Sequence, residues 1–237
     1  MKILAIESSG LVASAAIYED GKILAEYTLN YKMTHSETLM PAIKEICEKI
    51  SLALNTLDYI ACSMGPGSFT GLRIGAATAK GLALALNKPI IPVPTLDSMA
   101  YNIYDTDKTV CPIMDARRHQ VYAAVYKWEN NELLRLTDYF AEDIDYVMQK
   151  VASFGGEAIF LGDGITVYRD KILSRKGFFV APYYGAFQRA ALVAALGEKL
   201  AKDGVFVKGD DFKPFYIRKP QAERELEEKK AGRGLNV

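Results

Sequence analysis

Two predicted strands each end in an acidic residue that a short polar turn follows. Glu7 ends the apolar run at 2–7 and precedes Ser8-Ser9-Gly10. This pattern would suit a phosphate-binding hairpin, because a glycine lets the backbone approach a phosphate closely. A plain turn, capped by its serine side chains, explains the same residues equally well. Glu7 and Ser9 are therefore candidates for nucleotide chemistry, and the structural alternative stays open.

The second acidic strand end has a turn of different composition. Asp115 ends the predicted strand at 110–115 and precedes Ala-Arg117-Arg118. Two arginines stand where a phosphate-binding hairpin would carry glycine, so close approach of the backbone to a phosphate is disfavoured there. Asp115 is a third candidate, on its position alone.

The residue types that metal centres need are scarce. The only histidines are His35 and His119, and neither has a second histidine one helical turn away, so no helical metal motif exists. His35 precedes a predicted helix, which favours a capping or surface role over that of a base. Cys47, Cys62 and Cys111 lie in apolar runs without CxxC spacing, which predicts buried free thiols.

The most informative stretch is the sequence GPGSFTGLRIG at residues 65–75. Its first glycines leave a predicted strand, and Ser68 or Thr70 can cap the helix that we predict at 69–86. The free N–H groups at a helix N-terminus can bind an anion. No Gly-Lys-Ser/Thr follows at the required distance, so the stretch is not a P-loop.

The helix at 69–86 is unusually rich in glycine and alanine. Glycine destabilises a water-exposed helix, so these small residues need a packing reason. Close packing against the protein's own sheet is one explanation. The other, which we take as the prediction, is a flat surface for another chain. The predicted partner interface comprises His35, Gly67, Ser68, Phe69, Thr70, Gly71, Arg73, Gly75, Ala76 and Ala79.

The elements that must position these residues occur twice in the same order. The first half has predicted strands at 2–7, 13–18, 23–29, 58–64 and 90–93 and helices at 35–54 and 69–86. The second has strands at 110–115, 120–128, 133–140 and 158–161 and helices at 143–151 and 186–200, with a short strand near 215–217. This order predicts two copies of one β-β-β-α-β-α unit.

The predicted copies span 1–104 and 105–220, with a boundary in the polar stretch 102–108. Residues 221–237 are almost wholly charged and polar, which predicts a solvated, flexible tail. A segment that orders on a partner is the alternative for this tail.

Composition and charge limit the classes of function. The chain has 237 residues, of which 50% are apolar and 24% charged, as in ordinary globular proteins. Its 29 basic and 29 acidic residues balance, which argues against a dedicated nucleic-acid binder. No apolar run approaches the roughly 18 residues of a membrane span, and the apolar start is too short for a signal peptide. We expect a soluble cytoplasmic protein.

Three segments together resemble the TsaB family, also called YeaZ: MKILAIESS, MGPGSFTGLRIGAATAKGLA and IMDARRHQVYAAVY. The resemblance covers nearly all of residues 1–220. It implies an α/β fold of the duplicated actin/hexokinase/Hsp70-like (ASKHA) type with two similar subdomains. It also implies a subunit of the bacterial machinery that installs threonylcarbamoyl on adenosine 37 of tRNA.

The resemblance further implies a non-catalytic role. TsaD, the catalytic paralogue, carries a metal-binding HxxxH pair after a Pro-rich strand, and Thr95 and Met99 stand at those places here. The implied protein is a scaffold or activator that pairs with a TsaD-like paralogue and is joined by a TsaE-like ATPase. Alone it would form a homodimer. It would have no cofactor of its own, and would meet ATP, metal and tRNA only through the complex.

An enzyme of another class is the alternative reading of the same residues. An ASKHA-type phosphotransferase or ATPase acting on its own would use Glu7, Ser9 and Asp115. Nucleotide binding by the isolated chain separates the two readings.

Overall fold

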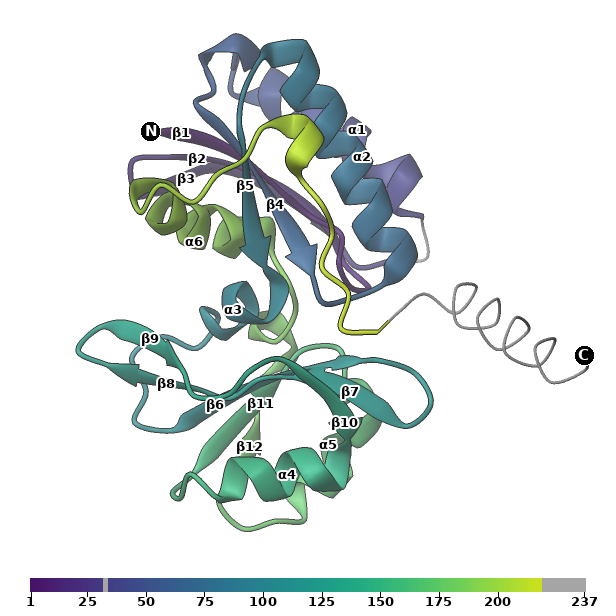
Figure 1. Ribbon diagram of the computed structural model, residues 1–237, viewed down its shortest axis with the longest axis vertical. Helices are drawn as coiled ribbons and strands as arrows, with labels where there is room; N and C mark the ends of the chain where they lie inside the picture. The colour runs from purple at the N-terminus through teal and green to yellow at the C-terminus, as the bar shows by residue number, and fades with distance from the viewer. Residues whose placement is uncertain (32–33, 219–237) are drawn as a thin grey trace, which may run out of the picture.

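The computed structural model describes residues 1–31 and 34–218 and has two α/β lobes, one above the other in Figure 1. The sheet of the first lobe has the strand order β3-β2-β1-β4-β5. Strands β1, β2 and β3 form an antiparallel meander, and β4 and β5 run parallel to β1. The five strands are β1 Lys2–Glu7, β2 Ala13–Glu19, β3 Lys22–Leu29, β4 Tyr59–Gly65 and β5 Ile90–Pro94.

Helices cover both faces of this sheet. α1 (His35–Lys49) and α2 (Phe69–Leu86) pack on one face and α6 (Ala190–Lys202) packs on the other (Figure 1). Alternation along β1 explains the two layers, because successive side chains point to opposite faces. Leu4 and Ile6 join the core under α1 and α2, whereas Ile3 and Ala5 join the core under α6.

The second lobe repeats this plan. Its sheet has the order β10-β7-β6-β11-β12, with the hairpin β8–β9 attached to β6 beyond this path. Its elements are β6 Thr109–Asp115, β7 Gln120–Ala123, β8 Tyr126–Glu129, β9 Glu132–Arg135, β10 Phe140–Asp143, α4 Ile144–Ala152, β11 Ala158–Leu161, α5 Ile165–Leu173 and β12 Phe178–Val180. The duplicated fold predicted from the sequence is therefore confirmed, with β8–β9 inserted into the second copy.

Several predicted elements of the second copy differ in detail. The predicted strand at 120–128 is two strands, because the chain leaves β10 after Ala123. β8 then pairs with β9 and, through Tyr126, with Val110 of β6. The predicted strand at 133–140 is likewise divided between β9 and β10. Neither α5 nor β12 was predicted, and residues 215–217 form no strand.

The last helix of each half packs toward the other lobe. α3 (Thr95–Ala100) contributes Leu96 and Met99 to the core of the second lobe. α6 contributes Ala190, Val193 and Ala194 to the core of the first. Assigning all of 105–220 to the second subdomain therefore does not hold for α6, since its apolar side chains complete the first sheet.

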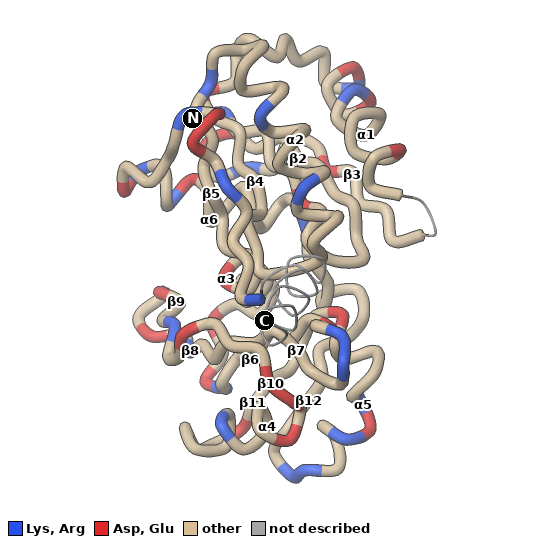
Figure 2. Tube along the Cα trace, turned by 45° about the vertical axis from the view of Figure 1, so that its right-hand side comes forward, with Lys and Arg blue, Asp and Glu red and all other residues tan. Residues whose placement is uncertain are grey.

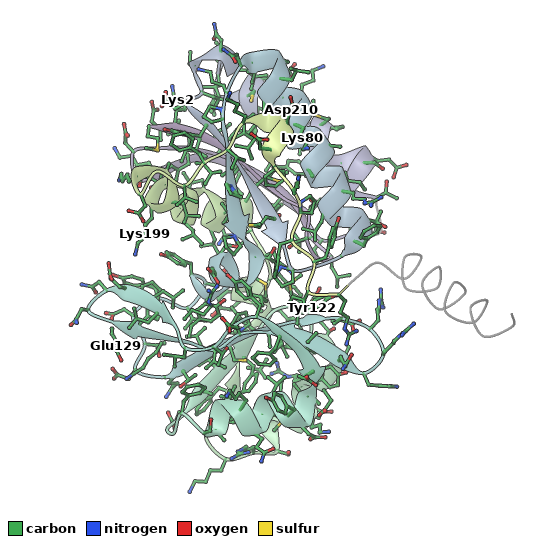
Figure 3. The ribbon with its side chains drawn as sticks, viewed as in Figure 1. Lys2, Lys80, Tyr122, Glu129, Lys199 and Asp210 are labelled. Atoms are coloured by element: carbon green, nitrogen blue, oxygen red, sulfur yellow. The ribbon has the colours of Figure 1, made fainter. Side chains whose placement is uncertain are left out.

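Residues 204–218, which we call the C-terminal strap, run from α6 back across the first lobe (Figure 1). Phe212 is buried there, and Lys80 Nζ on α2 donates a hydrogen bond to the Asp210 carbonyl at 3.2 Å (Figure 3). The Phe215 N–H then donates to the Met64 carbonyl at 2.6 Å, while its ring lies 5.8 Å from that of Tyr139 in the second lobe. The strap thus contacts both lobes. The predicted tail at 221–237 lies outside the described residues.

The three cysteines are buried and free, as predicted. Among the described residues, no helix is both long and apolar enough to span a membrane.

Candidate functional site

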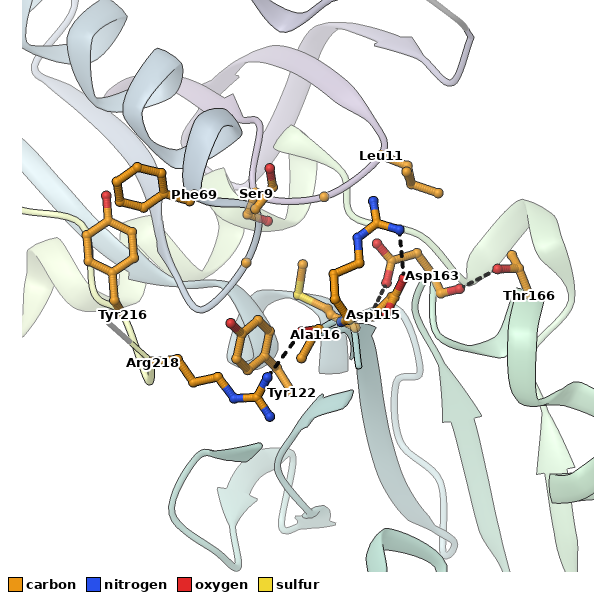
Figure 4. A pocket seen from close by; sticks show the side chains of 15 residues that line it. Ser9, Leu11, Phe69, Asp115, Ala116, Tyr122, Asp163, Thr166, Tyr216 and Arg218 are labelled. Carbon is orange, nitrogen blue, oxygen red and sulfur yellow. Dashed lines mark hydrogen bonds and ion pairs between the residues drawn. The ribbon is translucent and has the colours of Figure 1, made fainter. Parts of the chain in front are cut away.

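A cavity of about 430 Å³ lies between the lobes, where the acidic ends of β1 and β6 approach each other (Figure 4). The turn after β1, the start of α2, the turn after β6, the end of β11 and the strap all contribute to it. Its lining includes Ser9, Gly10, Leu11, Gly67, Ser68, Phe69, Met114, Asp115, Ala116, Arg117, Tyr122, Asp163, Thr166, Tyr216 and Arg218. The structure therefore brings the candidates Ser9 and Asp115 to one cleft.

Glu7 lies beneath this cleft and does not line it. Its side chain is fully buried, and Oε1 accepts hydrogen bonds from the Ser9 N–H at 2.6 Å and the Ser9 hydroxyl at 2.5 Å. Burial raises the pKa of the Glu7 carboxyl to about 7. The carboxylate thus holds the turn after β1 from inside.

Glycines of the 65–75 stretch pack directly on that turn. A Cβ on Gly67 would lie 2.3 Å from the Ser9 carbonyl oxygen, and one on Gly71 would lie 2.1 Å from that of Ser8. A Cβ on Gly75 would meet the Ser8 hydroxyl at 2.3 Å. Contacts this short are forbidden to real side chains, so these glycines are required by packing within the chain.

This packing corrects part of the predicted partner interface. Gly71, Gly75, Ala76 and Ala79 are buried, and the two alanines belong to the core between α2 and the first sheet. They cannot form an exposed surface, because the helix presents them to its own sheet. The first explanation of the small residues holds for this face of α2.

His35 also contacts the turn after β1. Its Nε2 lies 2.9 Å from the Gly10 carbonyl oxygen, and the side chain is half-buried at the start of α1. Thr34 and Glu37 form a capping box there, so Thr34 rather than His35 caps the helix. His35 joins α1 to the turn.

The outer face of α2 remains exposed. Thr70, Arg73, Ala77, Gly81 and Leu84 lie along it, and Leu84 is 81% exposed. Beside it, an apolar groove of about 540 Å³ runs between α1 and α2. The groove is lined by Met40, Ile43, Lys44, Cys47, Glu48, Ser51, Leu52, Leu54 and Leu82. Of the predicted interface residues, Ser68, Thr70 and Arg73 are exposed, and Gly67 and Phe69 are half-exposed.

Two carboxylates lie in the second-lobe part of the cleft. Asp163 is 7% exposed, and its Oδ1 accepts a hydrogen bond from the Asp115 N–H at 2.9 Å. Burial raises the pKa of the Asp163 carboxyl to about 6. Asp163 is not among the residues predicted for the site, although the Gly162-Asp163-Gly164 turn at a strand end marks its position.

The turn after β6 is not built on glycine. Asp115 Oδ1 accepts the Arg117 N–H at 2.7 Å, and Oδ2 lies 3.4 Å from the Arg117 guanidinium (Figure 4). Arg117, Arg118 and His119 have positive φ angles of +63°, +55° and +61°. The predicted difference between the two turns is therefore present in the structure.

Thr95 and Met99 are both fully buried on the connection between the lobes. Neither side chain suits a metal that prefers imidazole or carboxylate ligands. Within residues 1–31 and 34–218, no three His, Cys, Asp or Glu side chains gather as a metal site requires.

Comparison with known proteins places the chain in one family. The family model described as "TsaD: tRNA N6-adenosine threonylcarbamoyltransferase" matches residues 22–223. The TsaB protein of Bacillus subtilis, described as a tRNA threonylcarbamoyladenosine biosynthesis protein, is 32% identical over 94% of this chain and 96% of its own. The TsaB protein of Escherichia coli is 30% identical over 72% of this chain and 74% of its own.

A solved structure shares the fold. YeaZ from Pseudomonas aeruginosa superposes with a TM-score of 0.77 at 23% identity, covering 91% of this chain and 99% of that one.

Proposed function

The chain belongs to the TsaB family, and we infer that it is a non-catalytic subunit of the machinery that makes threonylcarbamoyladenosine in tRNA. The observation that carries this inference is the 32% identity to a TsaB protein over 94% of the chain. The reaction at adenosine 37 belongs to a TsaD-like paralogue, which this subunit supports as a scaffold or activator in the cytoplasm.

The residues of the chain support a role without chemistry of its own. Thr95 and Met99 replace the HxxxH pair of the catalytic paralogue, and Glu7 is committed to Ser9 beneath the cleft. ATP and metal are supplied by the partner subunits, and the chain carries no cofactor of its own.

The outer faces of α1 and α2 are the surface that we assign to the TsaD-like partner. The groove between the helices is mainly apolar, and Leu84 stands exposed beside it. Ala77 and Gly81 would let a partner helix approach closely, because small side chains shorten the distance between helix axes. In the absence of the partner, the same surface forms the homodimer. A TsaE-like ATPase joins the assembled complex.

Co-purification with a TsaD-like protein tests this function. We expect the chain to bind the TsaD-like protein, and the pair to make threonylcarbamoyladenosine when the remaining components are supplied. Mass spectrometry of tRNA nucleosides measures the product. Failure to bind, or full activity of the other components without this chain, would overturn the proposal.

Variants locate the surface. Ala77→Glu combined with Leu84→Glu should abolish co-purification, because two charges would be buried in an apolar contact. Arg175→Glu, on the loop before β12 in the second lobe, is the control and should leave binding unchanged. Equal binding by the wild-type chain, the double variant and the control would show that the partner surface does not lie on α1 and α2.

The alternative function, an ATPase or phosphotransferase that acts on its own, predicts the opposite result for nucleotide binding. An autonomous ATPase would bind nucleotide with micromolar affinity, and Glu7→Ala would abolish its hydrolysis. We expect weak or absent binding by calorimetry, since the turn after β6 carries arginines in place of the glycines that a phosphate site needs.

A further inference from the structure

The turn after β6 carries side chains that its backbone conformation disfavours. The Gln120 N–H donates to the Arg117 carbonyl at 3.1 Å, and the residues between them, Arg118 and His119, both have positive φ. Such turns favour glycine, asparagine or aspartate, since other residues crowd the backbone there. The turn between β8 and β9 obeys this rule with Asn130-Asn131 at +53° and +62°. Strain of this kind is typical of positions whose side chains have a function.

Two of these side chains, Arg117 and Arg118, are cationic, and all three are exposed to solvent. The Arg117 side chain is 85% exposed, and Arg118 and His119 are exposed beside it. Figure 2 shows this basic segment at the end of the hairpin beside β7. Arg117 pairs with Asp115, whereas no ion pair is recorded for Arg118 within the described part of the chain. Arg218 of the strap donates to the Ala116 carbonyl at 3.3 Å and so adds a further guanidinium to the same turn (Figure 4).

Charge is distributed unevenly between the rim and the floor of the cleft. Arg117 and Arg218 line the cleft, and Arg118 follows Arg117 on the exposed turn. The carboxylate of Asp163 is buried in the cleft and that of Asp115 is half-buried. A small anion that entered the cleft would face these carboxylates. An extended polyanion lying across the rim would contact several arginines and remain outside. The arrangement therefore favours a chain of phosphates over a single nucleotide.

Aromatic rings border the same rim. Phe69 and Tyr216 line the cavity with ring centroids 5.1 Å apart, and the Arg73 guanidinium lies 4.1 Å above the Phe69 ring. Arginines that fit phosphates, next to rings on which a base can stack, are typical of surfaces that bind unpaired nucleotides. An acidic protein surface would need the cations but not these half-exposed rings.

We propose that the rim formed by Arg117, Arg118, His119 and Arg218 binds backbone phosphates of the tRNA substrate. This rests on the proposed function, which supplies the RNA and the catalytic partner. The chain as a whole remains neutral, so the contact is local and adds to the tRNA affinity of the complex.

Binding of unmodified tRNA to the complex with the TsaD-like partner tests the proposal. Arg117→Gln combined with Arg118→Gln should weaken binding about tenfold in fluorescence anisotropy, because each lost phosphate contact removes counterion release. The slope of log affinity against log salt should fall by about two. Arg118→Lys keeps the charge and should keep the slope.

A second basic pair in the same lobe provides the matched control. Arg175 and Lys176 are exposed and precede β12, whose first residue, Phe178, pairs with the first residue of β11. They therefore lie at the opposite end of the parallel strands from the cleft. Arg175→Gln combined with Lys176→Gln should leave both affinity and slope unchanged.

The other outcomes overturn the proposal. Equal weakening by both pairs would mean non-specific attraction, and an unchanged slope in the rim variant would mean no phosphate contact. Loss of co-purification in the rim variant, with tRNA binding retained, would assign the rim to a protein partner. If the wild-type chain fails to bind the TsaD-like protein, the proposed function fails instead. In that case, titration of the same variants of the free chain with tRNA at low salt tests whether the rim binds tRNA without the partner.

Discussion

The turns after β1 and β6 occupy equivalent places in the two copies of the fold and are built in opposite ways. The serines of the first turn are buried: Glu7 bonds Ser9 from beneath, Gly67 packs on Ser9, and Gly71 and Gly75 of α2 pack on Ser8. The second is exposed and presents three basic residues in succession. After the duplication, the turn of the first copy packs in the interior of its lobe, whereas the turn of the second copy can present side chains to solvent.

The helices that follow account for part of this difference. α2 has 18 residues and lies against the first turn, whereas α5, in the matching position, has only 9. Gly71 and Gly75 of α2 pack on the first turn, whereas Gly162 and Gly164 before α5 pack on Ile113 within β6, and the second turn stays exposed. The second turn can therefore accept long side chains that the first would exclude.

Adding one carbon where the first turn is packed should give the largest effect. Gly71→Ala would place a Cβ 2.1 Å from the Ser8 carbonyl oxygen, so the turn or the helix must move. We expect a loss of about 3 kcal/mol, which lowers the Tm by roughly 6–12 °C. Differential scanning calorimetry measures it.

Gly81→Ala is the control on the same helix. No atom lies within 4 Å of a Cβ built there, and the position is exposed. Alanine should raise stability by about 0.5–1 kcal/mol through its higher helix propensity. Equal Tm changes in both variants would show that the first turn is not closely packed.

Removing the charge beneath the first turn should change the pH dependence of stability. The pKa of the Glu7 carboxyl is about 7 in the folded chain, against an ordinary value of 4.5. The folded state therefore binds the proton more tightly, and stability should fall by about 3 kcal/mol as pH rises from 4.5 to 7. Glu7→Gln keeps the acceptor for Ser9 and should remove this fall in urea unfolding.

Asp163→Asn is the counterpart in the second lobe. The raised pKa of Asp163, about 6, places its loss of stability at lower pH, between 3.8 and 6. The two variants should thus flatten different parts of the curve. Profiles of Glu7→Gln and wild type that run parallel through pH 4.5–7 would contradict the burial of a charge at Glu7.

Substitutions on the buried and the exposed face of α2 should differ in whether they lower stability or weaken association, with a somewhat smaller change in stability than in the variants above. Ala79 is fully buried between α2 and the first sheet, so Ala79→Leu should lower the free energy of unfolding by roughly 2 kcal/mol. The molecules that still fold should bind a TsaD-like partner with normal affinity. Ala77→Leu, two residues earlier on the exposed face, should melt normally and weaken association instead. Pull-down and thermal melting of both variants give the answer. Normal melting of Ala79→Leu would restore the interface assignment for that residue.

The smallest effect is a gain in the second turn. His119 has φ +61°, so His119→Gly should relieve crowding and raise stability by up to about 1 kcal/mol, a Tm increase of roughly 2–4 °C. Asn131→Gly, at φ +62° in the β8–β9 turn, is the control and should gain less, because asparagine tolerates this conformation. A destabilised His119→Gly would mean that the histidine side chain is required for folding.

Local patterns were sufficient to predict most of the first lobe. The helix predicted at 69–86 has those limits in the structure, since Ser68 caps its start and Asn87 ends it in a left-handed conformation. The second lobe was harder because its elements are short. α5 has no side-chain cap at Gly164 and mixes polar and apolar residues without a clear face, so no periodic signal marks it.

The site required tertiary information. Sequence placed Glu7, Ser9 and Asp115 at strand ends, but only the packing shows that Glu7 is sealed beneath the cleft. The small residues of α2 indicated a close contact, but not whether it is made within the chain or with another chain. Gly71 and Gly75 meet the chain's own turn, and Ala77 and Gly81 face outward. Composition alone cannot distinguish these faces.

The return of α6 to the first lobe has a consequence for the order in which the chain folds during synthesis. The buried core of the second lobe is built from one continuous stretch, from Leu96 in α3 to Ala186 after β12, and it is complete once these residues leave the ribosome. The first sheet, although translated earlier, keeps Ile3, Ala5 and Ala16 uncovered until α6 emerges. We therefore expect the second lobe to mature first on the ribosome. The first lobe, which carries the proposed partner surface, becomes complete only when translation is nearly over.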